Sequence, residues 1–189
     1  QNNRALTLSS TNLTVNNAVT LDDAGELIHT GTSNLFLLSS LNMSLGGINS
    51  AGGTVALGGT PTGGTLNLSD STLQLLGSLN AAATAFTAPT NLDVSADAAL
   101  TTPASADLRV TGLTLNDKTL TMGSDLAVAN QISLDAAGER IVTAGNDLTL
   151  SAAPSMSAGT IGSTGGTVTL GVASVIGGGT FDMDGSVLV

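Results

Sequence analysis

The chain has 189 residues, with 14 acidic side chains against four Lys and Arg, and a formal net charge of −10. This charge disfavours nucleic acid and anionic membrane surfaces as partners, because their phosphate groups are repelled. Aromatic residues make up 2% of the chain, and cysteine is absent. A disulfide framework and a thiolate metal site are therefore excluded, and any core must be built from aliphatic side chains. No run approaches the roughly 20 apolar residues that insertion in a membrane as a helix requires.

Short segments along the whole chain alternate an apolar residue with Thr, Ser, Asn, Asp or Ala. This two-residue period is typical of strands with one buried face. Gly, Asn, Asp and Ser separate the segments, as expected for tight turns. In chain order, the predicted strands are 5–8, 12–15, 18–21, 34–37, 54–57, 65–68, 72–75, 91–94, 113–115, 125–128, 131–134, 147–150 and 167–170.

The sequence is internally duplicated with an offset of 113 residues. Residues 17–58 align with 130–171 without a gap, and 21 of the 42 pairs are identical. Chance would match roughly a tenth of the pairs, so we interpret the chain as about 1.7 copies of one repeat. The first repeat is 1–113 and the partial second repeat is 114–189. We expect both to lie in a single rod, 1–189.

Apolar residues also recur at a shorter spacing of about 20 to 22 residues. A coil of this length with about three short strands predicts a parallel β-solenoid of roughly nine coils, because each coil must stack on the previous one. An antiparallel β-sandwich is the alternative all-β fold, since its turns recur about every 8 to 12 residues. The pairs with the coil spacing are Leu13–Leu35, Leu45–Leu66, Leu92–Leu113, Leu113–Leu134, Val128–Leu148 and Leu148–Val168.

The motif GGT occurs five times among these strands, at 52–54, 58–60, 63–65, 165–167 and 178–180. We interpret it as a turn that enters a strand, because the Lys and helix of a phosphate-binding loop are missing. The combination of GGT motifs and strands with alternating Leu resembles the repetitive β-helical regions of large bacterial surface proteins, of the filamentous-haemagglutinin-like adhesin and autotransporter passenger type. The resemblance implies a secreted right-handed β-helix that serves as a stalk, adhesin or fibre. It covers the whole chain but includes no recognisable secretion domain or cap.

Acidic side chains gather in LDDAGELI (21–28), which returns as LDAAGERI (134–141). Carboxylate clusters suit Ca²⁺, so the sequence offers weak candidates for a structural calcium ion. These candidates are Asp22, Asp23, Glu26, Asp182 and Asp184. No other cofactor is expected.

The second repeat favours a turn over a calcium site, because Ala136 replaces Asp23 there. On this interpretation the Asp after the strand caps backbone N–H groups, and Gly25 and Gly138 adopt positive φ. Glu26 and Glu139 then lie outward as solubilising groups.

Catalytic residues are not expected. His29 is the only histidine, and its counterpart in the second repeat is Val142, which favours a strand or surface position over a ligand. A β-helical carbohydrate-active enzyme is the distant alternative. Such sites use basic groups, Ca²⁺ or close carboxylate pairs, and four basic residues spread along the chain make one hard to build.

The two ends of the chain consist of strand-like apolar sequence without a recognisable cap, and an uncapped solenoid end is a template for further pairing. Val189 aligns with position 74 of the repeat and Gln1 with about position 115, so a second chain placed after the first would skip about 41 residues of the repeat. This interval is close to two whole coils, which predicts that the chains stack head to tail with their coils in the same rotational phase. We therefore predict a structural subunit or segment of an extracellular or cell-surface filament, with itself or neighbouring repeats as partner. An adhesin stalk or binding module for a host or matrix ligand is the alternative. The expected assembly residues are Ala5, Leu6, Leu8, Val187, Leu188 and Val189.

Overall fold

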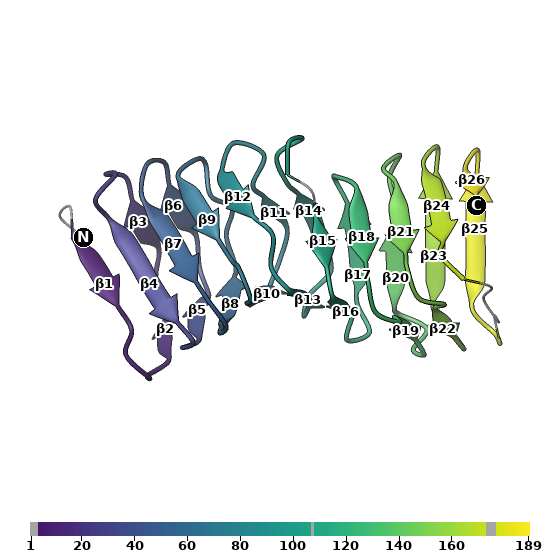
Figure 1. The fold of residues 1–189 in the computed structure, drawn as a ribbon, viewed down its shortest axis with the longest axis horizontal. Coiled ribbons are helices and arrows are strands. Elements are labelled where there is room, and N and C mark those ends of the chain that lie inside the picture. The colour runs from purple at the N-terminus through teal and green to yellow at the C-terminus, as the bar shows by residue number, and fades with distance from the viewer. Residues whose placement is uncertain (1–3, 107, 173–176) are drawn as a thin grey trace.

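The computed structural model describes residues 4–106, 108–172 and 177–189. Short strands wind into an elongated rod of about nine turns with roughly 20 residues per turn, and the described residues form no helix (Figure 1). Every strand pair is parallel. The predicted parallel β-solenoid is confirmed, and the antiparallel β-sandwich is wrong. Among the described residues, nothing has the form of a membrane-spanning helix.

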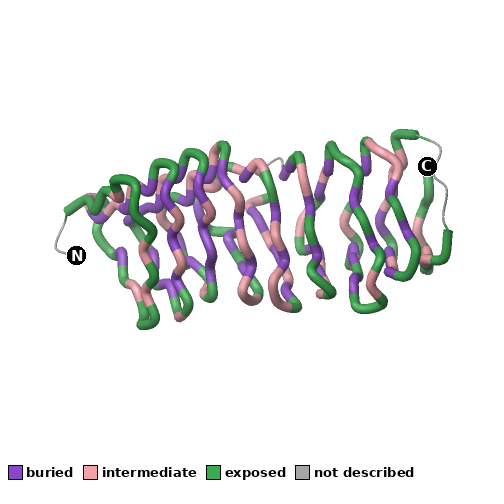
Figure 2. Tube along the Cα trace, turned by 90° about the horizontal axis from the view of Figure 1, so that it is seen from below, coloured by how far each residue is buried: buried purple, intermediate pink, exposed green. Residues whose placement is uncertain are grey.

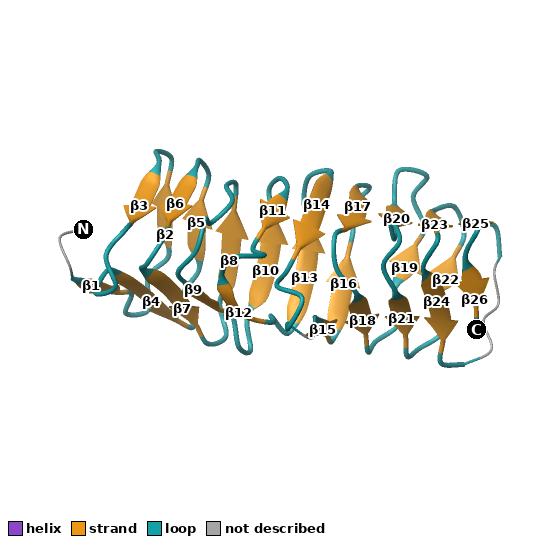
Figure 3. Ribbon diagram, turned by 90° about the horizontal axis from the view of Figure 1, so that it is seen from above, coloured by secondary structure: helices purple, strands orange, loops and turns teal. Residues whose placement is uncertain are grey.

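The strands lie in three rows along the rod, which we call sides 1, 2 and 3 (Figure 3). Side 1 contains β1 (Ala5–Thr7), β4 (Leu27–Gly31), β7 (Gly47–Ser50), β9 (Thr65–Asn67), β12 (Ala85–Thr87), β15 (Arg109–Val110), β18 (Leu126–Val128), β21 (Leu148–Leu150), β24 (Thr167–Leu170) and β26 (Val187–Leu188). Side 2 contains β2 (Leu13–Val15), β5 (Leu35–Leu37), β8 (Thr54–Leu57), β10 (Thr72–Leu75), β13 (Asn91–Val94), β16 (Gly112–Thr114), β19 (Ser133–Leu134) and β22 (Ser155–Met156). Side 3 contains β3 (Val19–Leu21), β6 (Leu41–Met43), β11 (Leu79–Asn80), β14 (Ala98–Thr101), β17 (Thr119–Met122), β20 (Arg140–Val142), β23 (Thr160–Thr164) and β25 (Thr180–Asp184).

The chain visits the sides in the order 1, 2, 3 and then begins the next turn, as β4, β5, β6 and β7 illustrate. Each side is made of two hydrogen-bonded sheets in succession. On side 1, for example, the sheet β1-β4-β7-β9-β12 is followed by β15-β18-β21-β24-β26. The three sides therefore enclose one continuous interior.

The interior is filled by aliphatic ladders. On side 2, Leu35 lies in register with Leu13 and with Val55, and Leu73 lies in register with Val55 and with Leu92. In strands such as β5, β10 and β21 alternate residues are buried, and buried positions recur from coil to coil along the rod (Figure 2). This regular stacking explains how a chain with few aromatic residues builds a core.

The predicted coil spacing is confirmed for Leu13–Leu35, Leu92–Leu113 and Leu148–Val168. It is wrong for Leu45–Leu66, because Leu66 lies in register with Ile48 and Leu45 is 63% exposed. It is also wrong for Val128–Leu148, because Val128 lies in register with Leu150 and Leu148 with Leu126. Leu113 and Leu134 share side 2, but their strands belong to different hydrogen-bonded sheets.

Candidate functional site

The LDxAGE turn is closed by its glutamate. Glu26 is only 2% exposed, and its Oε2 accepts hydrogen bonds from the backbone N–H groups of Asp22 at 2.8 Å and Asp23 at 3.2 Å. A carboxylate that accepts two backbone N–H groups is stabilised in its charged form even when it is buried. The expectation that Glu26 lies outward is therefore wrong. The glutamate accepts two backbone N–H groups of the turn, and of the two aspartates it is Asp23 that also caps it, with its Oδ1 accepting the N–H of Gly25 at 3.3 Å.

The second repeat forms the same turn with Ala136 in place of Asp23. Glu139 is buried, and its Oε2 accepts hydrogen bonds from the backbone N–H groups of Asp135 at 2.7 Å and Ala136 at 3.1 Å. Ala136 keeps the backbone N–H that Glu139 accepts, but it loses the side-chain acceptor that Asp23 Oδ1 offers to the N–H of Gly25 at 3.3 Å in the first repeat. The outward position expected for Glu139 is wrong for the same reason as for Glu26.

Ionisation of Glu26 reflects two opposing effects. Burial raises the pKa of Glu26, whereas hydrogen bonds from the backbone N–H groups of Asp23 and Asp22 lower it, and the net pKa lies below its ordinary value. Glu26 is therefore charged at neutral pH, and one of its oxygens is already engaged by the backbone.

The calcium candidates remain untested. Asp22 and Asp23 are exposed beside Glu26, and Asp182 and Asp184 are exposed at alternate positions of β25. Within the described residues, no three His, Cys, Asp or Glu side chains come together as a group that could hold a metal ion.

The glycines of this turn have a packing role. Gly25 and Gly138 are absent from the described glycines with positive φ, so that expectation is wrong. The N–H of Gly138 donates to Oδ1 of Asp117 on the preceding coil at 2.9 Å, and a Cβ at Gly138 would collide with this oxygen. At Gly138, glycine is therefore required by the close approach of the preceding coil.

Each glycine of the GGTV motif is required for a different reason: the first has a positive φ, and the second packs against the preceding coil. Gly52 has φ of 123°, and a Cβ at Gly53 would collide with the carbonyl oxygen of Ser33 on the preceding coil. The counterparts of this pair are Gly165, with φ of 85°, and Gly166. Strands β8, β9, β24 and β25 begin at the threonine of the GGT motifs 52–54, 63–65, 165–167 and 178–180, which confirms the predicted turn into a strand there. The prediction is wrong for 58–60, because no described strand begins at Thr60.

Side-chain oxygens link the starts of successive coils in the first repeat. Asn12 Oδ1 accepts the N–H of Asn34 at 3.0 Å, and Asn34 Oδ1 accepts the N–H of Thr54 at 2.8 Å. Each side chain therefore satisfies a backbone donor of the next coil.

The second repeat keeps this ladder but replaces amides with carboxylates. Asp125 Oδ1 accepts the N–H of Asp147 at 2.8 Å, and Asp147 Oδ1 accepts the N–H of Thr167 at 2.8 Å. Asn and Asp are interchangeable here because the ladder uses only an acceptor oxygen.

A second ladder of hydroxyl groups runs inside the rod. Thr30 Oγ1 donates to Ser50 Oγ at 2.8 Å, and Ser71 Oγ donates to the same Ser50 Oγ at 2.8 Å. Its counterpart joins Thr143, Ser163 and Ser186, with oxygen separations of 2.7 Å and 2.8 Å. In both ladders, side-chain hydrogen bonds join successive coils. Neither ladder was predicted from the sequence.

His29 occupies a half-buried position in β4, in register with Thr7 and Asn49. This confirms the predicted strand position. Its neighbours in register are polar but not acidic.

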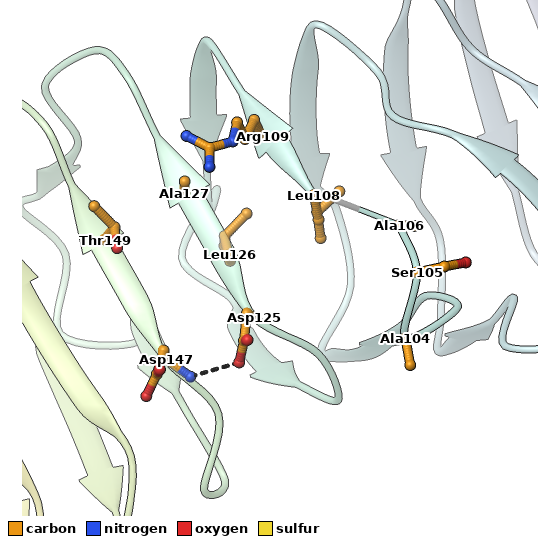
Figure 4. Close-up of a pocket in the computed structure, with 10 residues that line it drawn as sticks. All are labelled: Ala104, Ser105, Ala106, Leu108, Arg109, Asp125, Leu126, Ala127, Asp147 and Thr149. Atoms are coloured by element: carbon orange, nitrogen blue, oxygen red, sulfur yellow. Dashed lines mark hydrogen bonds between the residues drawn. The ribbon is translucent and has the colours of Figure 1, made fainter.

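A polar pocket of about 390 Å³ lies on side 1 around β15, β18 and β21 (Figure 4). Arg109 projects over Ala127 at one end, while Asp125 and Asp147 lie at the other end with the hydrogen bond between them. A guanidinium donor and carboxylate acceptors on one shallow surface suit a small ligand rich in hydroxyl groups. This pocket could not be predicted from the sequence, because its residues come from three coils.

The two ends of the described rod expose apolar groups. At one end, Leu6 is 38% exposed beside an apolar hollow of about 280 Å³ that Leu13 and Val19 also line. At the other end, Leu188 is 50% exposed and Val189 is 67% exposed. Leu6 belongs to β1 and Leu188 to β26, which are the first and last described strands of side 1.

The expected assembly residues lie at these two ends. Ala5 and Val187 are exposed, and Leu8 is half-buried. The structure therefore groups all six expected residues into two end surfaces, although it does not test their role.

No protein-family model, curated protein or solved structure matches the chain. The resemblance to β-helical surface proteins is thus supported at the level of fold alone, as a parallel β-solenoid of about nine turns.

Proposed function

We propose that this chain is a structural segment of an extracellular or cell-surface filament, which works by rigid length and by stacking of solenoid coils. The observation that supports the proposal most is what the two end surfaces of the described rod expose. Within the described residues, both combine strand edges that no further strand covers with exposed aliphatic side chains. Such an edge pairs readily with another coil, either from the same chain or from another molecule.

The ladders support the mechanical part of the proposal. Stacked coils are held by backbone pairing, aliphatic packing and side-chain hydrogen bonds between successive turns. Because these contacts recur along the rod, bending it would disturb several layers at once. A rod built in this way provides rigid length rather than a chemical activity.

An extracellular setting fits the composition. The chain has no cysteine to oxidise, and its net charge of −10 keeps the sides of rods apart while the apolar ends attract each other. The side surfaces and end surfaces therefore favour end-to-end over lateral association.

A binding module of an adhesin is the second candidate, and the pocket beside Arg109 favours it. The pocket's charged and hydroxyl groups match a glycan of a host or matrix surface. Glycan-array binding by the purified protein, lost in the Arg109→Ala variant, would favour this function. The expectation that the chain is not an enzyme stays a prediction, and release of reducing sugar from polysaccharides would contradict it.

Sedimentation velocity over a range of protein concentrations tests the filament proposal. We expect a population of large polymers that grows with concentration and dissolves on dilution. A single sedimenting species of monomer mass at every concentration would contradict the proposal.

A further inference from the structure

One phenylalanine lies on the outer face of the rod. The chain has three phenylalanines, and two of them, Phe86 and Phe181, pack against the interior aliphatic cluster. Phe36 instead alternates with the buried Leu35 and Leu37 of β5, so it is half-buried on the outside of side 2, where Figure 3 shows β5 between β2 and β8. Its ring therefore lies outside the interior packing.

Phe36 belongs to an apolar patch that spans three coils of side 2. Ala56 lies in register with it and is fully buried, although strand alternation places Ala56 on the outer face too. Its neighbours in register, Phe36 and Gln74, carry the larger side chains that cover it. Leu38 is 48% exposed two residues after Phe36, and Leu76 is half-buried two residues after Gln74. We call Phe36, Leu38, Ala56 and Leu76 the side-2 patch.

The groups around the side-2 patch are polar but uncharged. Its three coil segments, 34–38, 54–58 and 72–76, contain no charged residue, although the chain carries a net charge of −10. Thr54 and Thr72 lie in register on the same outer face, and Gln74 Nε2 donates to Ser95 Oγ at 2.9 Å. Hydroxyl and amide groups therefore border the aromatic and aliphatic side chains.

The second repeat shows that the solenoid does not need this patch. Thr149 and Ser151 stand at the positions of Phe36 and Leu38. Thr149 alternates with buried residues on the outer face of side 1, as Phe36 does on side 2. Hydroxyl side chains thus suit these solvent-facing positions of the fold. An aromatic ring and a leucine at the same positions in the first repeat are typical of a binding surface.

The dimensions of the side-2 patch favour a small ligand over a protein. Three coils and two alternate strand positions span about 10 Å by 7 Å between Cα atoms. A specific protein interface buries about 800 Å² on each partner, roughly ten times the area of this patch. A second rod is disfavoured further, because both rods carry the net charge of −10.

The chemistry of the side-2 patch matches a sugar. A sugar ring offers a face of C–H groups that packs on an aromatic or aliphatic surface, and its hydroxyl groups bond to neutral amides and hydroxyls. The patch and its border supply both kinds of group. An acidic sugar would be repelled by the net charge of the chain.

We propose that the side-2 patch binds an uncharged saccharide whose ring packs on Phe36 and Leu38. The neighbouring threonine and glutamine side chains then hold its hydroxyl groups. This inference goes beyond the proposed filament, and it concerns a different surface from the pocket beside Arg109, which lies on side 1. Because the patch lies on the side of the rod, stacking of coils leaves it accessible.

An array of immobilised uncharged and acidic oligosaccharides, probed with the purified native chain, tests this binding. The test variant is the double substitution Phe36→Thr and Leu38→Ser, which introduces the residues of the second repeat; urea unfolding checks that it keeps the fold. We expect the native chain to bind uncharged glycans. The double variant should bind the best of them about tenfold more weakly or worse, because an aromatic anchor is lost.

Two single variants complete the design. Leu45→Ser removes a leucine that is 63% exposed outside the patch, and it should bind as the native chain does. Leu38→Ser alone should weaken binding several-fold, and it keeps the test valid if the double variant is less stable. All variants should form the same polymers in sedimentation velocity, so this inference and the filament proposal can fail separately.

Three results would overturn the inference. The first is a native chain that binds no uncharged glycan or prefers acidic ones. The second is binding that survives in the double variant but is lost in Arg109→Ala, which would assign the glycan to the pocket on side 1. The third is side-by-side bundling of native rods that disappears in the double variant without any glycan binding, which would assign the patch to a second copy of the chain.

Discussion

Ser50 Oγ lies 2.8 Å from Thr30 Oγ1 in the interior of the rod, although the two residues are 20 positions apart in the chain. The distance in sequence is one coil, so the hydrogen bond ties one turn to the next. The same pair of residue types meets again as Ser163 and Thr143 in the second repeat. The duplication keeps this contact, so a polar ladder lies beside the aliphatic ladders of the core in both repeats.

Replacement of Ser50 by alanine is expected to destabilise the fold by about 1–3 kcal/mol, because it leaves two buried hydroxyl groups without their shared partner. The midpoint of urea unfolding measures the loss. Ser40→Ala, at an exposed position, is the matched control and is expected to change stability by less than about 0.5 kcal/mol. Equal midpoints for Ser50→Ala and Ser40→Ala would show that the ladder contributes nothing.

Replacement of Gly53 by alanine should destabilise the fold by about 2 kcal/mol or more, because the added Cβ meets the backbone of the preceding coil. Gly77→Ala provides the control, since a Cβ at Gly77 meets nothing within 4 Å. This control is expected to be neutral or to stabilise by about 0.5 kcal/mol, through the unfolded state. Thermal unfolding of the two variants compares them directly. A loss in Gly77→Ala as large as in Gly53→Ala would contradict the close approach of the coils.

The fold could be predicted from the sequence because strand alternation and coil spacing are local or periodic signals. Every predicted strand overlaps an observed one, from 5–8, which contains β1, to 167–170, which matches β24. Among the strands that were missed, β6 and β17 keep buried Leu and Met residues at alternate positions, whereas others carry small or polar residues at inward positions. In β7, Gly47 and Ser50 are buried, and in β23, Gly162 and Ser163 are buried, so the apolar alternation is lost.

The turn and the ladders were harder to predict. A carboxylate is usually exposed, and only the coordinates show that Glu26 folds back on the backbone of Asp22 and Asp23. One signal was present in the sequence, because the second repeat keeps the glutamate while losing Asp23.

The turn glutamate predicts an acid-sensitive contribution to stability. The folded-state pKa of Glu26 lies below its ordinary value of 4.5, so ionisation favours the folded state. This contribution is fully present above the unfolded-state pKa and is lost as pH falls through the lower folded-state pKa. In Glu26→Gln the contribution is absent at every pH.

Urea unfolding of the native chain and Glu26→Gln at pH 7 and pH 3 measures this effect. The native chain is expected to be the more stable of the two at pH 7, and the difference should shrink at pH 3. A difference that is unchanged or larger at pH 3 would contradict the role assigned to the carboxylate.

Salt should promote assembly of the chain. The net charge of −10 repels two molecules that approach end to end, and added salt screens this repulsion. Light scattering at about 0.05 M and 0.5 M NaCl should therefore show a lower critical concentration at the higher salt. Assembly that weakens as salt is added would indicate that attraction between opposite charges, rather than apolar ends, drives it.

Electron microscopy of negatively stained protein tests the stacking of coil ends most directly, when the native chain is compared with Leu188→Lys and Leu45→Lys. Leu188 is exposed at the end of the rod, whereas Leu45 is 63% exposed in the turn that joins β6 to β7 in the second coil, outside the two end surfaces. We predict unbranched filaments one rod wide for the native chain and for Leu45→Lys, and single rods for Leu188→Lys. Dispersed single rods of the native chain at high concentration, or filaments that survive in Leu188→Lys, would contradict end-to-end assembly.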